Sequence, residues 1–240
     1  MAERNLTING SALSGGGTFH HVTIRGDVTI RGDIECDRWK VFGSADVKGV
    51  VTARTFRLFG QANVDGPVHA EKMDAFGEAD IRGHARLGHL QLLGMVQVEG
   101  NVEADAIRGY GELSVSGSCE AEIVSLTGVV RIGQTLNAEQ VELSLYFADS
   151  SIKEIGGRMI RIKRGKTWKA VHWLTRLSPL TATLVADTIE GDDIYLEHTK
   201  AAVVRGDRVT IGPGCEIGLV EYRTAFAQDE QAAVEEKRQR

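Results

Sequence analysis

Seven histidines and three cysteines are the residues best suited to chemistry in this 240-residue chain. His69 and His84 fall on neighbouring outward columns of the repeat described below, so their imidazole rings could approach each other. Two histidines without a carboxylate or thiol partner make a poor zinc site, because zinc in proteins takes three or four such ligands. We therefore predict surface histidines, with no bound metal and no other cofactor.

The three cysteines are Cys36, Cys119 and Cys215. Cys36 and Cys119 lie in inward columns of different repeats, and Cys215 lies far along the chain. An odd number of cysteines in core positions is typical of reduced thiols in a cytoplasmic protein. We predict that all three are buried and act as small core hydrophobes.

Two further patterns point weakly to an enzyme. Residues 209–218 read like two hexads of a hexapeptide-repeat acyltransferase, but that fold uses 18-residue coils and a loop histidine as general base. Asp46, Asn63 and Asp80 share one column, and such a ladder is more often a hydrogen-bonded surface. The sequence contains no nucleophile–base pair, phosphate loop or cofactor fingerprint. We predict a nonenzymatic protein without a small-molecule substrate and keep an acyltransferase as the third alternative.

All these residues belong to, or flank, seven consecutive 17-residue repeats that run from Thr23 to Val141. The eighth position of each repeat is Val or Ile, and the tenth is glycine in six of the seven. A short fixed period indicates a stacked solenoid. Seventeen residues are too few for a strand and a helix, so we predict an all-β protein, a β-helix (β-solenoid) of 17-residue coils. Glycine supplies the backbone freedom of a corner at the fourth position of every repeat, namely Gly26, Gly43, Gly60, Gly77, Gly94, Gly111 and Gly128.

Within a repeat, apolar and polar residues alternate, which places one set of side chains inside and the other in water. The second repeat shows the pattern with Ala45, Val47, Val51 and Ala53 at the inward positions. Single coils have almost no core, so stacking of neighbouring coils must supply it.

Composition limits the possible functions. Twenty-eight glycines against three prolines suit a solenoid, and a net charge of −5 does not suggest a nucleic-acid partner. The first residues lack the apolar core of a signal peptide, and no 18-residue apolar stretch occurs. We therefore expect a cytoplasmic protein.

The composition also divides the chain. We predict a flexible N-terminal tail over residues 1–21, in which an imperfect first coil around Leu6–Gly10 is the alternative, and a regular β-helix over 22–141. An irregular β-helical continuation follows over 142–222, with a basic amphipathic insertion at 158–180. A charged C-terminal tail, frayed or helical, covers 223–240.

The repeats resemble those of the bactofilins, a family of bacterial polymer-forming cytoskeletal proteins. The resemblance rests on repeats of the form seen in residues 47–53 (VKGVVTA), and residues 204–215 are similar to the C-terminal part of longer Bacillus-type members. It implies a right-handed, triangular β-helix that joins end to end into filaments without nucleotide. It also implies scaffold roles in cell shape, motility or protein positioning, with this chain or a related paralogue as the partner.

Assembly can also be expected on physical grounds, because an uncapped solenoid end presents open backbone groups over an apolar core. We predict a polymer interface on the end coil at Ile24, Ile30 and Ile34. The third position of the repeats forms a second candidate surface, a stripe that could pair filaments or dock a partner. The alternative is a curled corner in which the second and third positions are both partly buried. If only that stripe is used, the protein is a non-polymerising binding module. The stripe consists of Phe42, Phe59, Phe76, Leu93 and Tyr110.

A third candidate surface is the basic segment around residues 158–180, which interleaves positive charges with tryptophan. Such a segment suits an anionic membrane surface or a partner, and packing across the solenoid is the alternative. Membrane binding by this segment would place the protein peripherally on the inner face of the membrane. The residues involved are Lys163, Arg164, Lys166, Trp168, Lys169, Trp173 and Arg176.

Overall fold

The computed structural model describes residues 4–165 and 182–240 of the chain. Within these ranges every regular element is a β-strand, and the strands form a parallel β-solenoid, as the repeats predicted. The chain divides into two units, residues 1–122 and 123–240, each described by itself below. Handedness and a triangular cross-section stay predictions.

The strands of unit 1 are β1 (Leu6–Ile8), β2 (Ala12–Ser14), β3 (Gly17–Ile24), β4 (Asp27–Ile30), β5 (Ile34–Val41), β6 (Ser44–Val47), β7 (Val51–Leu58), β8 (Gln61–Val64), β9 (Val68–Ala75), β10 (Glu78–Ile81), β11 (Ala85–Val98) and β12 (Val102–Val115). Strand β13 (Cys119–Leu145) begins in unit 1 and continues in unit 2. The remaining strands of unit 2 are β14 (Ser150–Arg164), β15 (Leu184–Leu196), β16 (Thr199–Ile211), β17 (Glu216–Gln228) and β18 (Ala233–Gln239).

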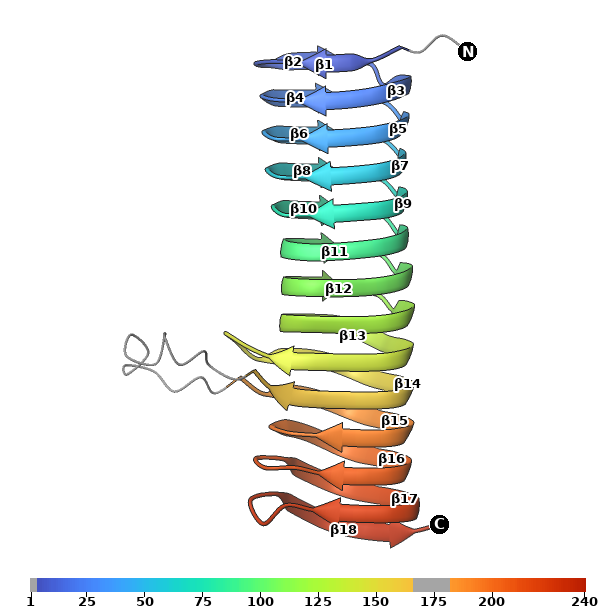
Figure 1. Ribbon diagram of the computed structural model, residues 1–240, viewed down its shortest axis with the longest axis vertical. Helices are drawn as coiled ribbons and strands as arrows, with labels where there is room; N and C mark the ends of the chain where they lie inside the picture. Colours follow the sequence, from blue (N-terminus) through green and yellow to red (C-terminus); the bar gives the residue numbers. More distant parts are fainter. Residues whose placement is uncertain (1–3, 166–181) are drawn as a thin grey trace, which may run out of the picture. The chain divides into compact units, whose positions relative to one another are not determined.

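From the coil of β3 and β4 onward, successive coils of unit 1 stack in a constant register of 17 residues, whereas the first coil pairs at a spacing of 16, as Leu6 does with Val22. Val51 of β7 pairs with Val68 of β9, and Ala45 of β6 pairs with Ala62 of β8. Figure 1 shows the long strands β3, β5, β7 and β9 as successive layers, with the short strands β4, β6, β8 and β10 stacked beside them. Each column of the repeat therefore becomes a straight row of side chains.

The inward columns predicted from alternation are buried. Ala45, Val47 and Val51 have no exposed surface, and Ala53 is 4% exposed. Alternation did not predict a further core column at the seventeenth position, where Trp39 stacks on Phe56 with ring centroids 4.5 Å apart. That column became inward because two consecutive residues at the preceding corner both face outward, which reverses the alternation.

The glycine column has a different cause from the predicted one. Among the fourth-position glycines of unit 1, only Gly111 has a positive φ. A Cβ on Gly60 would instead overlap the carbonyl oxygen of Gly43 in the preceding coil, and Gly77 meets Gly60 in the same way. Close stacking of the coils at this corner, rather than an unusual backbone conformation, therefore requires glycine.

Unit 2 keeps the parallel ladder but loses the fixed period. Hydrogen-bonded partners in neighbouring coils are 19 residues apart at Thr135 and Glu154, 15 at Arg208 and Asp193, and 16 at Arg205 and Glu221. None of these spacings equals the 18-residue coil length of a hexapeptide-repeat acyltransferase. The irregular continuation predicted for this region is therefore a solenoid with variable coil length.

Three predicted boundaries are wrong. Residues 1–21 are not a loose tail, because β1, β2 and the start of β3 lie there, and Phe19 is buried; the alternative of a first coil around Leu6–Gly10 agrees with β1. Residues 223–240 are neither helix nor loose tail, because β17 continues to Gln228 and β18 pairs with β17 from Ala233. The basic insertion does not begin at residue 158, because β14 runs to Arg164 and buries Ile160 and Ile162.

Candidate functional site

The terminal coil of unit 1 precedes the one predicted from the repeats. Strand β1 pairs with β3, so that Ile8 lies above Ile24, and β2 pairs with β4, so that Ser14 lies above Ile30. Ile24 and Ile30 are fully buried, and Ile34 is 1% exposed. The prediction of an end face at these three residues is therefore wrong, because the first coil covers Ile24 and Ile30 and Ile34 packs between the coils of β3 and β7.

The first coil itself forms an open sheet edge. The carbonyl groups of Arg4 and Ile8 accept hydrogen bonds from the N–H groups of His20 and Arg25, at 3.0 and 2.9 Å. Backbone groups in a parallel strand alternate in direction. The N–H and C=O of Thr7, between these acceptors, therefore point to the other edge, which no described strand precedes.

The composition of this edge favours pairing. Residues 5–16 contain no charged side chain. Ile8 is buried, Leu6 is half-buried, and Leu13 exposes 64% of its surface. An uncharged edge strand with apolar side chains is a template for another strand, because charge and proline are the usual means of blocking one.

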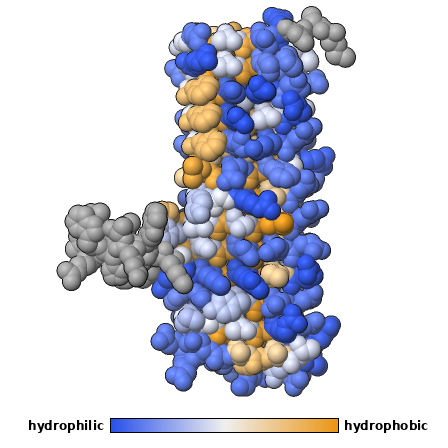
Figure 2. Space-filling model, in the orientation of Figure 1, coloured by the Kyte–Doolittle hydropathy of each residue, from blue (hydrophilic) through white to orange (hydrophobic). Residues whose placement is uncertain are grey.

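The third-position stripe faces solvent. Phe42, Phe59 and Phe76 are 40–47% exposed, whereas the adjacent second-position residues Val41 and Leu58 are fully buried. The rings of Phe42, Phe59 and Phe76 stack in sequence with centroids 5.0 and 5.2 Å apart. Leu93 and Tyr110 continue the row with 51% and 63% exposure. Figure 2 shows apolar side chains in a row along one edge of these coils.

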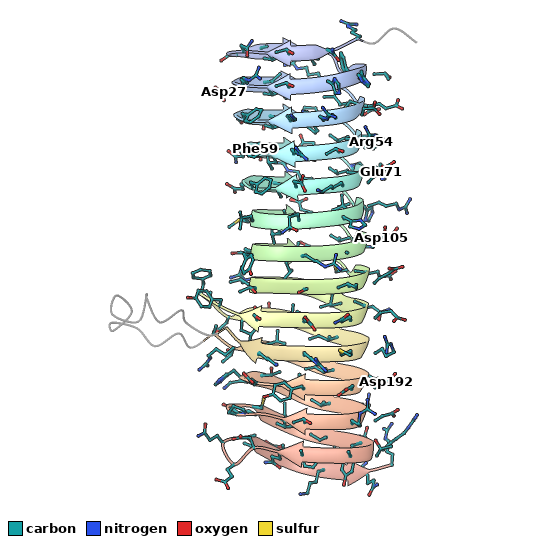
Figure 3. The ribbon with its side chains drawn as sticks, viewed as in Figure 1. Asp27, Arg54, Phe59, Glu71, Asp105 and Asp192 are labelled. Carbon is teal, nitrogen blue, oxygen red and sulfur yellow. The ribbon has the colours of Figure 1, made fainter. Side chains whose placement is uncertain are left out.

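A groove of about 1140 Å³ runs along another part of unit 1. Its lining includes the column of small residues at Ala53 and Ala70, with charged side chains beside them. Arg54, Glu71 and Asp105 lie along this side in Figure 3, away from Asp27 and Phe59. Acidic and basic groups alternate and pair, as His20 does with Asp37 at 2.8 Å. Because its lining mixes acidic and basic groups, the groove favours neither an anionic nor a cationic ligand.

The other chemical candidates of the sequence have structural roles. His84 accepts a hydrogen bond from the Asn101 N–H at 3.0 Å. Asn63 donates to Asp46 at 2.7 Å, so this part of the column is a surface ladder. Within residues 4–165 and 182–240, no group of three or more His, Cys, Asp or Glu side chains is placed to hold a metal ion.

The three cysteines are free and buried, as predicted. Burial raises the pKa of the Cys36 and Cys119 thiols to about 12 and that of Cys215 to about 11, because a thiolate loses its hydration there. Protonated thiols are poor nucleophiles, so these side chains act as core residues.

Two residues of the basic segment lie within the described ranges. The Lys163 ammonium lies over the Tyr195 ring, 5.2 Å from its centroid. The Arg164 N–H donates to Glu197 at 3.2 Å, and its guanidinium reaches the Ala182 carbonyl at 3.5 Å. The other five predicted residues, Lys166, Trp168, Lys169, Trp173 and Arg176, lie outside the described residues. No described helix is long and apolar enough to span a bilayer.

A comparison with known proteins assigns the family. The uncharacterized protein YhbE of Bacillus subtilis (strain 168) is 61% identical over 230 residues, which cover 96% of this chain and 95% of YhbE. The chain belongs to the family of YhbE. The uncharacterized protein YhbF of the same organism is 42% identical over 102 residues, but these span only 42% of this chain and 40% of YhbF. No family model matches the chain, and no solved structure matches it.

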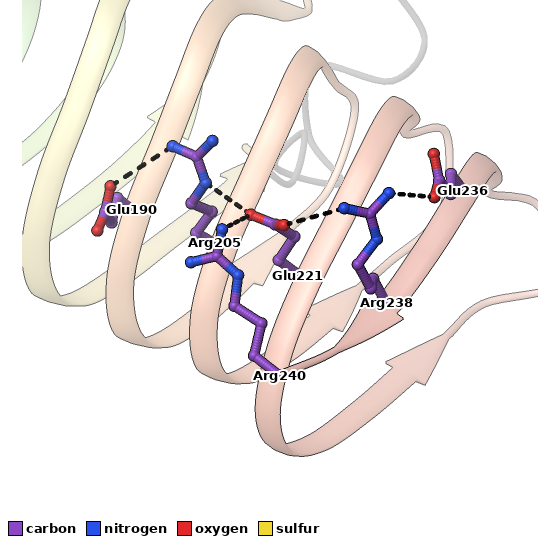
Figure 4. A network of polar contacts seen from close by, with 6 residues as sticks. All are labelled: Glu190, Arg205, Glu221, Glu236, Arg238 and Arg240. Carbon is purple, nitrogen blue, oxygen red and sulfur yellow. Dashed lines mark hydrogen bonds and ion pairs between the residues drawn. The ribbon is translucent and has the colours of Figure 1, made fainter.

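Sequence reasoning missed one polar site in this YhbE-family chain, a network that attaches the last strand of unit 2 (Figure 4). The Glu221 side chain is only 5% exposed and accepts hydrogen bonds from Arg205 at 2.7 Å and Arg240 at 2.5 Å. Arg238 approaches it to 3.9 Å. These contacts lower the pKa of Glu221, chiefly through the Arg205 hydrogen bond. The spacing of 16 residues between Arg205 and Glu221 was the available signal, but it lies outside the 17-residue repeat.

Proposed function

We propose that this protein is a nonenzymatic structural subunit that self-associates end to end through the open edge of its first coil. The observation that carries the proposal is the uncharged edge of β1 and β2, where Thr7 directs its backbone groups outward. Leu13 does the same, because the adjacent Ser14 carbonyl accepts a hydrogen bond from the Arg31 N–H of the next coil at 2.8 Å. A second copy of the same edge supplies both the missing hydrogen-bond partners and an apolar surface for Leu6 and Ile8.

The energetics of a sheet edge support this assignment. Backbone N–H and C=O groups are obligatory hydrogen-bonding groups, and burying them unpaired costs free energy. Two edges that meet satisfy each other's groups while they bury apolar side chains. An association of this kind needs no nucleotide or metal, because pairing itself provides the driving force.

The bactofilin-like repeats support the same function. They imply a subunit that joins end to end into a cytoplasmic scaffold for cell shape, motility or protein positioning. A β-solenoid fold is consistent with such a structural role. The partner is a second copy of this chain or a related chain of the same family.

The proposal is tested by removing the outward hydrogen-bond donors of the edge. Proline lacks an N–H group, so Thr7→Pro combined with Leu13→Pro blocks the edge while it leaves the bonds from β1 and β2 to the next coil in place. Thr7→Ala combined with Leu13→Ala is the matched control, because it keeps both N–H groups. Sedimentation velocity of the unaltered protein and both variants measures the particle size.

We expect the unaltered protein and the alanine control to sediment as polymers or oligomers, and the proline variant as monomers. Far-UV circular dichroism should show the same β-spectrum for all three proteins. Unchanged particle size in a folded proline variant contradicts the proposed edge. Monomers for the unaltered protein at all concentrations contradict self-association.

The exposed aromatic stripe favours a second candidate function, that of a non-polymerising binding module. Such a module gives discrete particles of the same size with and without the proline substitutions. The same sedimentation experiment therefore separates the two functions.

A further inference from the structure

The aromatic stripe of unit 1 separates two surfaces of opposite charge. The stripe lies at the corner between the long and short strands of each coil. Outward residues two positions before it border one side, and outward residues two positions after it border the other. In the third coil, Arg57 and Gln61 occupy these positions beside Phe59.

The side that follows the stripe is acidic. The outward side chains at the second and fourth positions after the stripe carry five negative charges and no positive one, at Asp27, Asp46, Glu78, Asp80 and Glu112. Asp27 lies at the same edge as Phe59 in Figure 3. We call this surface the acidic flank.

The side that precedes the stripe is basic. The outward side chains at the second and fourth positions before the stripe carry five positive charges, at Arg38, Lys40, Arg57, Lys72 and Arg108. Asp74 is the one acid among them, but it is 5% exposed and pairs with Arg57 at 3.0 Å and Lys72 at 3.2 Å. The net surface on this side, which we call the basic flank, is therefore positive.

From this arrangement we infer that the stripe binds the stripe of a second copy of this chain, with the two copies parallel and related by a two-fold axis along the stripe. A rotation about that axis brings the acidic flank of one copy against the basic flank of the other, on both sides of the contact. A rotation that makes the copies antiparallel places acid against acid and base against base. Charge complementarity therefore selects the parallel pair.

The parallel arrangement also keeps equal residues opposite each other. Phe42 faces Phe42, and Tyr110 faces Tyr110, so one stripe side chain from each copy can share an apolar contact at every coil. Coils stack about 4.8 Å apart, so five stripe residues span about 19 Å. A patch of this length is small for a stable dimer, which buries about 800 Å² per partner. The pairing is therefore weak and concentration-dependent. It requires no end-to-end association.

Cysteine cross-linking tests the orientation. Arg25, whose guanidinium lies over the Phe42 ring, marks one end of the stripe, and Tyr110 marks the other. Arg25→Cys and Tyr110→Cys are made separately, mixed at high protein concentration and oxidised. The native thiols are buried, so they react slowly. Thr52→Cys, exposed on β7 but away from the stripe, is the matched control. All three are combined with the Thr7→Pro and Leu13→Pro substitutions, which removes cross-links from end-to-end contact.

The parallel pair predicts cross-links from position 25 to 25 and from 110 to 110, at least tenfold above the Thr52→Cys control, and no excess of cross-links from 25 to 110. A dominant link from 25 to 110 overturns the parallel orientation. Equal cross-linking at all positions, or none above the control, overturns pairing through the stripe and leaves it as a surface for a different molecule.

A second variant tests the aromatic rings and the charges. Phe42→Ser, Phe59→Ser and Phe76→Ser together should lower the Arg25→Cys cross-link about tenfold, to the control level, while the β-spectrum is retained. Raising salt should also lower the cross-link, because screening weakens attraction between exposed charges. A cross-link that persists without the rings overturns the inference, and one that is insensitive to salt overturns the role of the flanks.

Discussion

Phe56 and Phe59 offer a direct test of how the repeat divides core from surface. They lie three residues apart in one coil, yet Phe56 is fully buried against Trp39 and Phe59 is 46% exposed in the stripe. Truncating Phe56 to alanine removes a core ring and leaves a cavity, which costs about 3–5 kcal/mol. Truncating Phe59 to alanine leaves a space that is open to solvent. Because the ring is already half exposed, only about half of its transfer free energy is lost, roughly 1 kcal/mol.

Thermal unfolding followed by far-UV circular dichroism measures both effects. A chain of this length loses about 2–4 °C in melting temperature per kcal/mol. We therefore expect a fall of roughly 6–20 °C for Phe56→Ala and roughly 2–4 °C for Phe59→Ala. Each variant is the control for the other, because both remove the same atoms from the same coil. Equal losses, or a larger loss for Phe59→Ala, would refute the assignment of the two columns.

Two further predictions concern titratable groups. We expect the free energy of unfolding to fall above pH 9 by about 1.4 kcal/mol per pH unit per buried thiol. Replacing the three cysteines with alanine should therefore make this fall less steep. Unfolded thiols ionise near pH 9, whereas the folded thiols keep their protons to about pH 11 or 12. Glu221→Gln should speed amide hydrogen exchange in β18, because the charge that holds Arg205 and Arg240 is lost.

Raised thiol pKa values make the folded state lose stability as pH rises, and an identical pH slope in the cysteine-free variant contradicts the prediction. The lowered pKa of Glu221 makes its contribution present above pH 4.5, and it is lost as pH falls through the folded-state value. Glu236→Gln is the matched control, since Glu236 is 59% exposed. Equal exchange rates in both variants contradict the role of Glu221.

The sequence was sufficient for the parts of the fold that repeat. The columns at Val47 and Val51 could be assigned inward because alternation and period agree there. The Trp39 column could not, because Asp37 and Arg38 both face outward at a corner and reverse the alternation. After such a corner, the inward residues fall at positions that the alternation assigns to the surface. They can be recognised as core only when the position of the corner is known.

The ends of the chain were mispredicted for another reason. Strand β18 has almost no apolar pattern, since its sequence AVEEKRQ exposes nearly every side chain. Its place depends on backbone pairing with β17 and on the ion pairs of Glu221, neither of which is visible as hydrophobic periodicity. The coil around Leu6–Gly10 was expected only as an imperfect one within a tail, because Leu6 pairs with Val22 at a spacing of 16, one residue short of the repeat.

The number of subunits that can join through the proposed end contact depends on the character of the last strand. Strand β18 carries Glu235, Glu236, Lys237 and Arg238 on an edge strand, and charged side chains on an edge oppose pairing with another chain. The β1 edge carries no charge at all. If pairing uses only uncharged edges, two subunits meet through β1 and growth stops at a dimer. A longer polymer therefore requires a second contact, and the aromatic stripe, with its acidic and basic flanks, is the surface of unit 1 that we propose for it.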